Sequence, residues 1–254
     1  MTLPSMCTGN PVTNKMIVSI NQPAYIPWLG YFQRIAVSDV HILLDHVQFE
    51  KNSFTNRNKI KTLDGWCWLT VPVKTKSKFG KLPINLVEID NSTNWRMKHW
   101  LTIRHSYSKA PYFHEHSSFF ESVYQHEWQY LSDLCSETTN YLLNALTIKT
   151  SLLFSSQMHS EGVKDELVLN LCKKVGASIY LSGIIGQNYI RKELFEIEGI
   201  KVMYQNYHHP NYPQCRGKSF EPYMSIVDLL FNCGSQSGDI LINNQDFIQT
   251  SALI

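Results

Sequence analysis

Hydrophobic and polar positions in the first fifth of the chain follow the pattern of a strand, a helix and a second strand. Residues 16–20 (MIVSI) are a short β-rich run that ends before Pro23, because proline cannot donate a ladder hydrogen bond. Large apolar residues then recur at helical spacing over residues 28–36, and residues 40–44 form another β-rich run. Two strands joined through a helix are expected to be parallel with a right-handed crossover, which places the loop 22–27 at a carboxyl edge of the sheet.

The middle third changes to the pattern of a β-hairpin followed by helices. Residues 58–62 and 66–73 are β-rich and are separated by a tight Asp-Gly turn, so they predict a hairpin whose aromatic face packs inward. Apolar residues recur every three or four positions over residues 95–107 and 117–146, which predicts two or three helices. We expect these helices to form a layer or cap.

The last third returns to alternating strands and helices, with glycines after several predicted helices. The expected strands are 151–155, 179–181 and 200–204, and the expected helices are 163–175, 189–197 and 224–231. Alternation at both ends of the chain predicts an α/β fold. We expect one mostly parallel, Rossmann-like sheet with helices on both faces, to which the β-hairpin and the helical insertion of the middle third are added.

Composition is consistent with one domain. A chain of 254 residues, of which 43% are hydrophobic, can bury the core of a single α/β domain, although two closely packed lobes are the alternative. We expect that domain to span residues 16–254. Residues 1–15 are polar, with scattered Pro, Thr and Asn and no apolar run, so we expect a flexible N-terminal tail without a signal peptide.

Charge and cysteine usage narrow the partners and the compartment. A formal net charge of +2 does not favour a nucleic-acid partner, so we expect a small-molecule substrate. No window reaches the roughly 18 consecutive apolar residues that a membrane-spanning helix needs. The six cysteines are spread singly without a CxxC pair, which indicates reduced thiols in a cytoplasmic protein. His208, His209 and Cys215 lack the paired spacing of zinc ligands, and we expect no metal site.

Three polar clusters follow predicted strand ends, where open parallel sheets bind their ligands. The first contains Gln22 and Tyr25, which we predict to bind substrate. Pro23 and Pro27 fix the backbone around them, and Gly30 permits a close approach of chain or ligand. A rigid start of the following helix is the alternative interpretation.

The second cluster combines a carboxylate, amides, an ammonium and a guanidinium: Asp45, Gln48, Lys51, Asn56, Arg57 and Asn58. Such a density of polar groups can orient an anionic substrate. Arginine offers a planar fork for phosphate or carboxylate, and lysine offers a point charge that burial can turn into a nucleophile. An ordinary surface loop is the alternative.

The third cluster contains residues from two successive loops. Ser182 lies beside glycines that can expose backbone N–H groups to phosphate, although their spacing matches neither a Walker loop nor GxGxxG. Gln205, Tyr212 and Gln214 are predicted substrate-binding residues in the loop that follows. His209 can act as a base near neutral pH, whereas an exposed or turn-capping histidine is the alternative.

These clusters lie in long segments that resemble the WbqC-like family, which is associated with bacterial surface-polysaccharide gene clusters. The segments are INQPAYIPWLGYFQRI, SDVHILLDHVQFEKNSFTNRNKI and WCWLTVPV, then IYLSG, YPQ and FEPYMSIVDLLFNCG. The resemblance runs from about residue 16 to residue 234. It implies a cytoplasmic role in building O-antigen or related glycans of lipopolysaccharide, by modifying an activated sugar.

The resemblance and the polar clusters lead to three functional hypotheses. The first is a transferase that attaches an acyl or aminoacyl group to the amine of a nucleotide sugar. The second is nucleotidyl transfer, suggested by a likeness in element order to nucleotidylyltransferases, whose HxGH signature is replaced here by WLGY at residues 28–31. The third is a non-catalytic protein that binds a glycan intermediate or a partner through its aromatic residues.

For the first hypothesis the residue types suggest roles. Transfer to an amine needs a base and donors that stabilise the developing oxyanion. We predict Asp45 or His209 as the base and Lys51 as a further catalytic group. Gln22, Gln48 and Asn56 are predicted hydrogen-bond donors, and Arg57 is predicted to hold a phosphate or carboxylate. An acyl or aminoacyl donor is expected, and no cofactor is identified.

Overall fold

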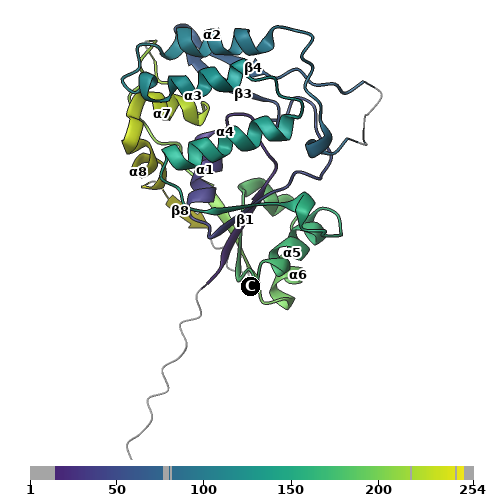
Figure 1. Cartoon of the computed structure of the whole chain (residues 1–254). Coiled ribbons are helices and arrows are strands. Elements are labelled where there is room, and N and C mark those ends of the chain that lie inside the picture. The colour runs from purple at the N-terminus through teal and green to yellow at the C-terminus, as the bar shows by residue number, and fades with distance from the viewer. Residues whose placement is uncertain (1–14, 77–79, 81, 218, 244, 249–254) are drawn as a thin grey trace, which may run out of the picture.

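A six-stranded sheet in the order β5-β2-β1-β6-β7-β8 lies in the lower half of the molecule (Figure 1). Its strands are β1 Ile17–Asn21, β2 Val40–Leu43, β5 Ser151–Phe154, β6 Ile179–Ser182, β7 Lys201–Tyr207 and β8 Gln245–Ile248. The computed structural model describes residues 15–76, 80, 82–217, 219–243 and 245–248. The first five strands are mutually parallel and β8 is antiparallel to β7, so the predicted mostly parallel α/β fold is confirmed.

The two faces of the sheet are covered by different helices. Because side chains alternate along a strand, Val18 and Ile20 face one side, where they pack in a cluster with residues of α5 (Asp165–Lys174) and α6 (Lys192–Ile197). Ser19 faces the opposite side, on which α1 (Leu29–Ala36) lies. Helices α7 (Ile226–Cys233) and α8 (Ser237–Ile242) pack beside α1.

The hairpin and the helices of the middle third form the upper half in Figure 1. The hairpin consists of β3 (Arg57–Thr62) and β4 (Gly65–Thr70), and the helices are α2 Trp95–Tyr107, α3 Phe113–Gln125 and α4 Leu131–Ala145. Short 3₁₀ turns connect elements at η1 Ile84–Leu86, η2 Ser155–Gln157, η3 Ile184–Asn188 and η4 Gly234–Gln236. The predicted hairpin and the predicted insertion of two or three helices are therefore confirmed, with three helices present among the described residues.

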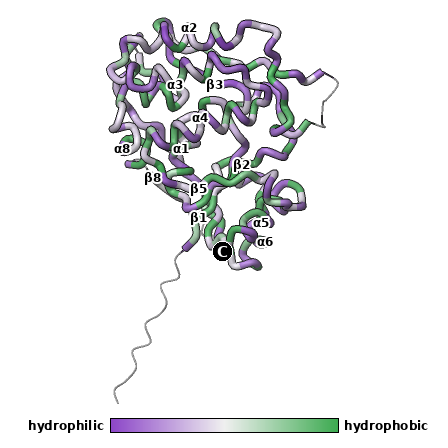
Figure 2. The backbone as a smooth tube through the Cα atoms, in the orientation of Figure 1, coloured by the Kyte–Doolittle hydropathy of each residue, from purple (hydrophilic) through white to green (hydrophobic). Residues whose placement is uncertain are grey.

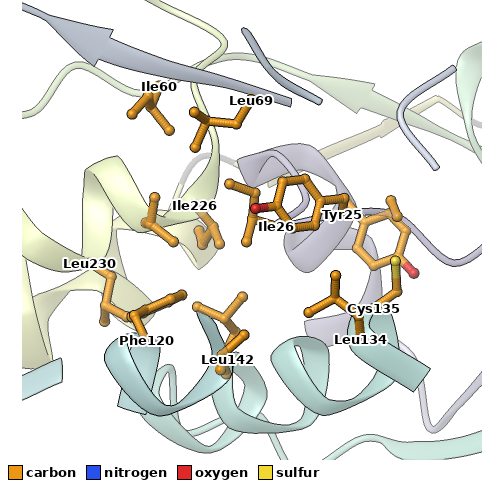
Figure 3. Packing of buried hydrophobic residues seen from close by; sticks show 14 of the residues in the cluster. Tyr25, Ile26, Ile60, Leu69, Phe120, Leu134, Cys135, Leu142, Ile226 and Leu230 are labelled. Atoms are coloured by element: carbon orange, nitrogen blue, oxygen red, sulfur yellow. The ribbon is translucent and has the colours of Figure 1, made fainter. Parts of the chain in front are cut away.

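One hydrophobic core joins the upper half to α1 and the sheet (Figure 3). Ile60 and Leu69 from the hairpin point down towards Ile26, which lies in the loop between β1 and α1. Leu142 from α4 and Ile226 from α7 complete this centre. The loop that follows β1 is therefore packed between the hairpin, α4 and α7.

The predicted inward packing of the hairpin's aromatic face is wrong. Trp66 and Trp68 are 45% and 37% exposed, whereas Ile60 and Leu69 on the other face are buried. Strand alternation forces this choice, since only one face of a two-stranded hairpin can contact the core. The aliphatic face makes that contact.

Several other boundaries differ from the prediction. The helix expected over residues 189–197 begins only at Lys192, because residues 184–188 form a 3₁₀ turn. Neither α8 nor β8 was anticipated from the sequence pattern. The expected tail lies outside the described residues apart from Lys15. Among the described helices none is both long and apolar enough to span a membrane. Figure 2 shows hydrophilic and hydrophobic residues intermixed along the described chain.

Candidate functional site

A pocket of about 560 Å³ opens at the carboxyl ends of β1, β6 and β7. Its wall includes Asn21, Ser182 and Gln205, which lie at or near the ends of those strands. After β1, strands β2 and β5 are added on one side of it, whereas β6 and β7 are added on the other side. The order in which strands are added therefore reverses at β1, while β1 and β6 remain parallel. Such a switch point is where open α/β sheets form ligand sites. The predicted location at a carboxyl edge is therefore occupied by a pocket.

Arg34 supplies the pocket's positive charge. Its side chain extends from α1, is only 5% exposed and lies against Gly183, where an added Cβ atom would collide with Nη1. Burial lowers the pKa of Arg34, although an arginine remains charged at neutral pH. No carboxylate among the described residues pairs with it, and its buried Nε has no hydrogen-bond partner there. A buried guanidinium with open donors is suited to an anionic ligand.

Neighbouring groups add further donors and aromatic surface. The buried Nδ2 of Asn21 also lacks a described hydrogen-bond partner. Trp28, Tyr180 and Tyr189 contribute rings to the wall. Within the described residues, the wall contains no aspartate or glutamate, so no negatively charged side chain opposes the charge of Arg34 there. The pocket therefore combines hydrogen-bond donors suited to an anion with flat aromatic surfaces.

Tyr207 presents a hydroxyl that His209 orients. The tyrosine lines the pocket, and its hydroxyl lies 2.8 Å from Nδ1 of His209. The backbone N–H of Tyr223 donates to Nε2 of His209 over 3.3 Å, and burial lowers the pKa of His209 to about 4. In the neutral ring Nδ1 then carries the proton and donates to the tyrosine oxygen. The hydroxyl proton of Tyr207 is therefore not used in the hydrogen bond with His209.

Gln205 links β7 to α1 at the pocket wall. Its Nε2 donates to the carbonyl oxygen of Gly30 over 2.9 Å and to Oε1 of Gln33 over 2.7 Å. Gly30 also lies against the ring of Tyr207, since a Cβ atom there would be 3.0 Å from Cγ of that ring. The predicted close approach at Gly30 is made by protein side chains, and it holds α1 next to the pocket.

The residues of the second predicted cluster lie away from this pocket. Asp45 follows β2 and is buried, and its carboxylate accepts hydrogen bonds from Ser155 Oγ and from both N and Oγ of Ser156 over 2.6–2.9 Å. Gln48 accepts from the backbone N of Leu82, and Lys51 is exposed beside it. A second hollow, of about 480 Å³, lies beside Gln48 and Lys51. The predicted catalytic roles of Asp45 and Lys51 stay predictions.

Strand alternation separates three consecutive predicted binding residues. Asn56 and Asn58 are buried and donate to the carbonyl oxygens of Val71 and Ile26. Arg57 points to the outer face of the hairpin, where its guanidinium carbon lies 4.4 Å from the centre of the Trp68 ring. The two asparagines therefore hold the hairpin on the core.

The first predicted cluster is also divided. Tyr25 is fully buried and its hydroxyl lies 2.9 Å from Nδ1 of His99 in the core. Gln22 borders a shallow hollow of about 240 Å³ that adjoins the main pocket at Asn21 and Trp28. Of these two residues, Gln22 is the one within reach of a ligand.

Tyr212 and Gln214 belong to a buried polar network around Asp228. They donate to Asp228 Oδ2 over 2.8 and 2.6 Å, and Tyr107 donates to Oδ1 over 2.9 Å. Burial raises the pKa of Asp228, and these donors oppose that rise. The network fixes the loop after β7 onto α7, at a distance from the pocket wall.

The structure thus places Ser182 and Gln205 in the pocket and His209 directly behind its wall. Sequence reasoning missed Arg34, Asn21 and Tyr207. Arg34 stands in the segment YFQRIA, where helical periodicity assigns a charged residue to solvent. Instead every residue from Leu29 to Ile35 is buried, because α1 is covered by the sheet on one side and by other helices on the other.

Comparison with known proteins identifies relatives of the whole fold. A model of the WbqC-like protein family matches residues 22–240. The chain is 37% identical over 227 residues to the "Uncharacterized protein Rv1507c" of Mycobacterium tuberculosis, and the match covers 88% of this chain and 96% of that protein. No solved structure matches the chain. The chain belongs to the WbqC-like protein family.

Proposed function

We propose that the pocket at the β1/β6 switch point binds a nucleotide-activated amino sugar and that the protein transfers an acyl or aminoacyl group to the sugar amine. The observation that carries the binding step is the buried Arg34, which lines the pocket without a described carboxylate partner. A phosphate group would supply the missing negative charge. The planar guanidinium can bind two phosphate oxygens at once.

The rest of the wall suits the other parts of such a molecule. A volume of about 560 Å³ is within the range of roughly 300–1,000 Å³ that small-molecule sites occupy. Trp28 and Tyr189 offer faces for a base or a sugar ring. The free hydroxyl proton of Tyr207 can donate to the oxyanion that develops during acyl transfer. These features support a place for substrate and a stabilising donor.

The alternative of binding without turnover is favoured by one observation. No aspartate, glutamate or histidine is among the described residues that line the pocket, and burial raises the pKa of Tyr207, so its hydroxyl stays protonated. A base for the amine would then be brought by the donor or by a partner. A mass-spectrometric assay with sugar nucleotide and acyl donor separates the two functions: a modified sugar supports the transferase, and bound but unmodified sugar supports the binding protein.

Arg34→Met tests the binding step. Thermal shift and calorimetry would be measured with UDP, dTDP and their amino-sugar conjugates. Loss of a charged hydrogen-bond pair worth about 1.5–3 kcal/mol should weaken binding by about 10- to 100-fold. The melting temperature should stay equal or rise, because an unpaired buried charge is removed. Gly183→Ala should weaken binding in the same direction by displacing the guanidinium.

Arg104→Met is the matched control, since Arg104 is exposed on α2. It should bind like the wild type. Unchanged affinity in Arg34→Met, or absence of a thermal shift with every nucleotide tested on the wild type, would remove the proposed substrate class.

A further inference from the structure

The outer face of the hairpin carries aromatic and basic side chains in register. Lys59 is paired across the strands with Trp68, and Lys61 with Trp66. The ammonium of Lys59 lies 4.7 Å from the centre of the Trp66 ring, and Arg57 stacks on Trp68 at 4.4 Å. Both tryptophans remain more than one third exposed. This surface of Arg57, Lys59, Trp66 and Trp68 is called the hairpin face below.

The cations of the hairpin face are available to a ligand. Lys61 is buried and its ammonium donates to the carbonyl oxygen of Ser219, so it is not counted as part of the hairpin face. By contrast, neither Arg57 nor Lys59 pairs with a carboxylate in the part of the chain that the structure describes. The buried Nε of Arg57 also lacks a hydrogen-bond partner there. A ligand with carboxylate or phosphate groups would satisfy these donors.

Aromatic contacts connect the hairpin face to the pocket. The centres of the Trp66 and Trp68 rings are 6.0 Å apart, and Phe54 lies 6.0 Å from Trp68. Phe54 is 4.9 Å from Trp28, which lines the pocket, and is itself 41% exposed. A ligand that leaves the pocket past Trp28 therefore meets a continuous row of rings.

We propose that the hairpin face binds an acidic oligosaccharide that extends from the pocket. This inference rests on the proposed function. The acidic oligosaccharide would be a second ligand, bound next to the nucleotide sugar. A pyranose ring can lay its C–H face on the open side of a tryptophan whose other side carries a cation. Its acidic groups then reach Arg57 and Lys59.

Two observations favour a saccharide over single-stranded nucleic acid. The planes of Trp66 and Trp68 are 86° apart, so parallel stacked bases cannot lie on both rings, whereas sugars can turn about their glycosidic bonds. The chain has 23 basic and 21 acidic residues, which gives a polyphosphate little net attraction. The hairpin face therefore suits a chain with separated charges.

The test measures tryptophan fluorescence and calorimetric binding with hexagalacturonate, an acidic sugar chain, and with neutral maltohexaose. The wild type should bind hexagalacturonate at least tenfold more tightly than maltohexaose. The affinity for hexagalacturonate should fall as salt rises. Trp68→Ala and the double variant Arg57→Gln/Lys59→Gln should each weaken that binding at least tenfold, with circular dichroism confirming their fold. Lys149→Gln is the control, because Lys149 is exposed before β5 at the amino edge of the sheet.

Arg34→Met separates this proposal from the proposed function. It should weaken nucleotide-sugar binding by about 10- to 100-fold and leave hexagalacturonate binding unchanged. If the wild type binds a nucleotide sugar but does not bind hexagalacturonate, the hairpin site is overturned and the proposed function is not. Equal affinity for maltohexaose, or tighter binding to a dodecamer of thymidylate or to phosphatidylglycerol vesicles, would also overturn it.

Discussion

At the residue scale, two buried basic residues, His41 and Arg34, lie close enough for the charge of Arg34 to lower the pKa of His41. His41 in β2 is fully buried and its Nδ1 lies 2.7 Å from Oγ of Ser19, which accepts a hydrogen bond from Ser38. Burial, with a smaller contribution from the charge of Arg34, lowers the pKa of His41 to about 3. The histidine therefore stays neutral, and the positive charge of this region is concentrated on Arg34.

This burial makes stability depend on pH. The unfolded chain protonates His41 near pH 6.5, whereas the folded protein does so near pH 3, so the folded state is favoured above pH 6.5 and loses stability as the pH falls. Each such histidine contributes a slope of up to about 1.4 kcal/mol per pH unit. His99, whose pKa burial lowers to about 4, adds to the effect.

We predict a lower free energy of unfolding at pH 5 than at pH 7.5, measured by urea denaturation. His41→Gln should reduce the difference between the two pH values. His105→Gln, at an exposed position of α2, should leave it unchanged. An identical pH dependence in wild type and His41→Gln would show that His41 does not carry this linkage.

Residue roles were predictable from sequence only where the backbone alone decides them. Ser182 ends β6 and Gln205 lies near the end of β7, and strand ends of a parallel sheet meet at one edge whatever surrounds them. Arg34 depends on what covers α1, and its cover comes from helices some 200 residues later in the chain. Periodicity within one helix carries no information about such distant packing.

At the element scale, one face of the hairpin packs on the core and the other face is exposed. The segment WCWLTV places tryptophans on one face and Cys67 and Leu69 on the other, so it reads as apolar on both. The partner strand resolves the ambiguity, because its alternation of Arg57 and Lys59 with Ile60 leaves one aliphatic face. The position of the hairpin was therefore predictable, and its orientation required the cross-strand register.

Stability measurements can separate the two faces. Ile60→Ala removes a fully buried side chain and should lower the free energy of unfolding by about 2–5 kcal/mol. Lys59→Ala on the hairpin face should change it by about 1 kcal/mol or less, since it loses contacts with two partly exposed rings. Urea denaturation followed by circular dichroism would measure both. Similar losses in the two variants would contradict the two-faced arrangement.

At the scale of the whole molecule, two hydrophobic clusters share the central sheet. The larger one joins α1, the hairpin and the upper helices, and the other packs α5 and α6 on the opposite face. Val47 contacts both clusters. This continuity supports our proposal that residues 16–254 form one domain. The edge strand β8 was not predictable, because its antiparallel pairing follows from the open edge of β7 rather than from its own sequence.

A single domain should unfold in one cooperative step. All six tryptophans lie between Trp28 and Trp128, so their fluorescence reports on the upper half and α1. Far-UV circular dichroism also reports on the lower half. We predict coincident urea transitions from the two signals. A fluorescence transition at clearly lower urea would instead indicate two lobes.

The reversal of strand order at β1 also determines when the parts of the pocket are synthesised. During synthesis on the ribosome, Trp28 and Arg34 emerge early, but the strands that complete the pocket come only in the last third of the chain. A nascent chain that stops before Gly183 has the arginine without the surface on which it rests. Ligand binding is therefore a property of the nearly finished polypeptide, and a stalled or truncated product cannot sequester the ligand in this pocket.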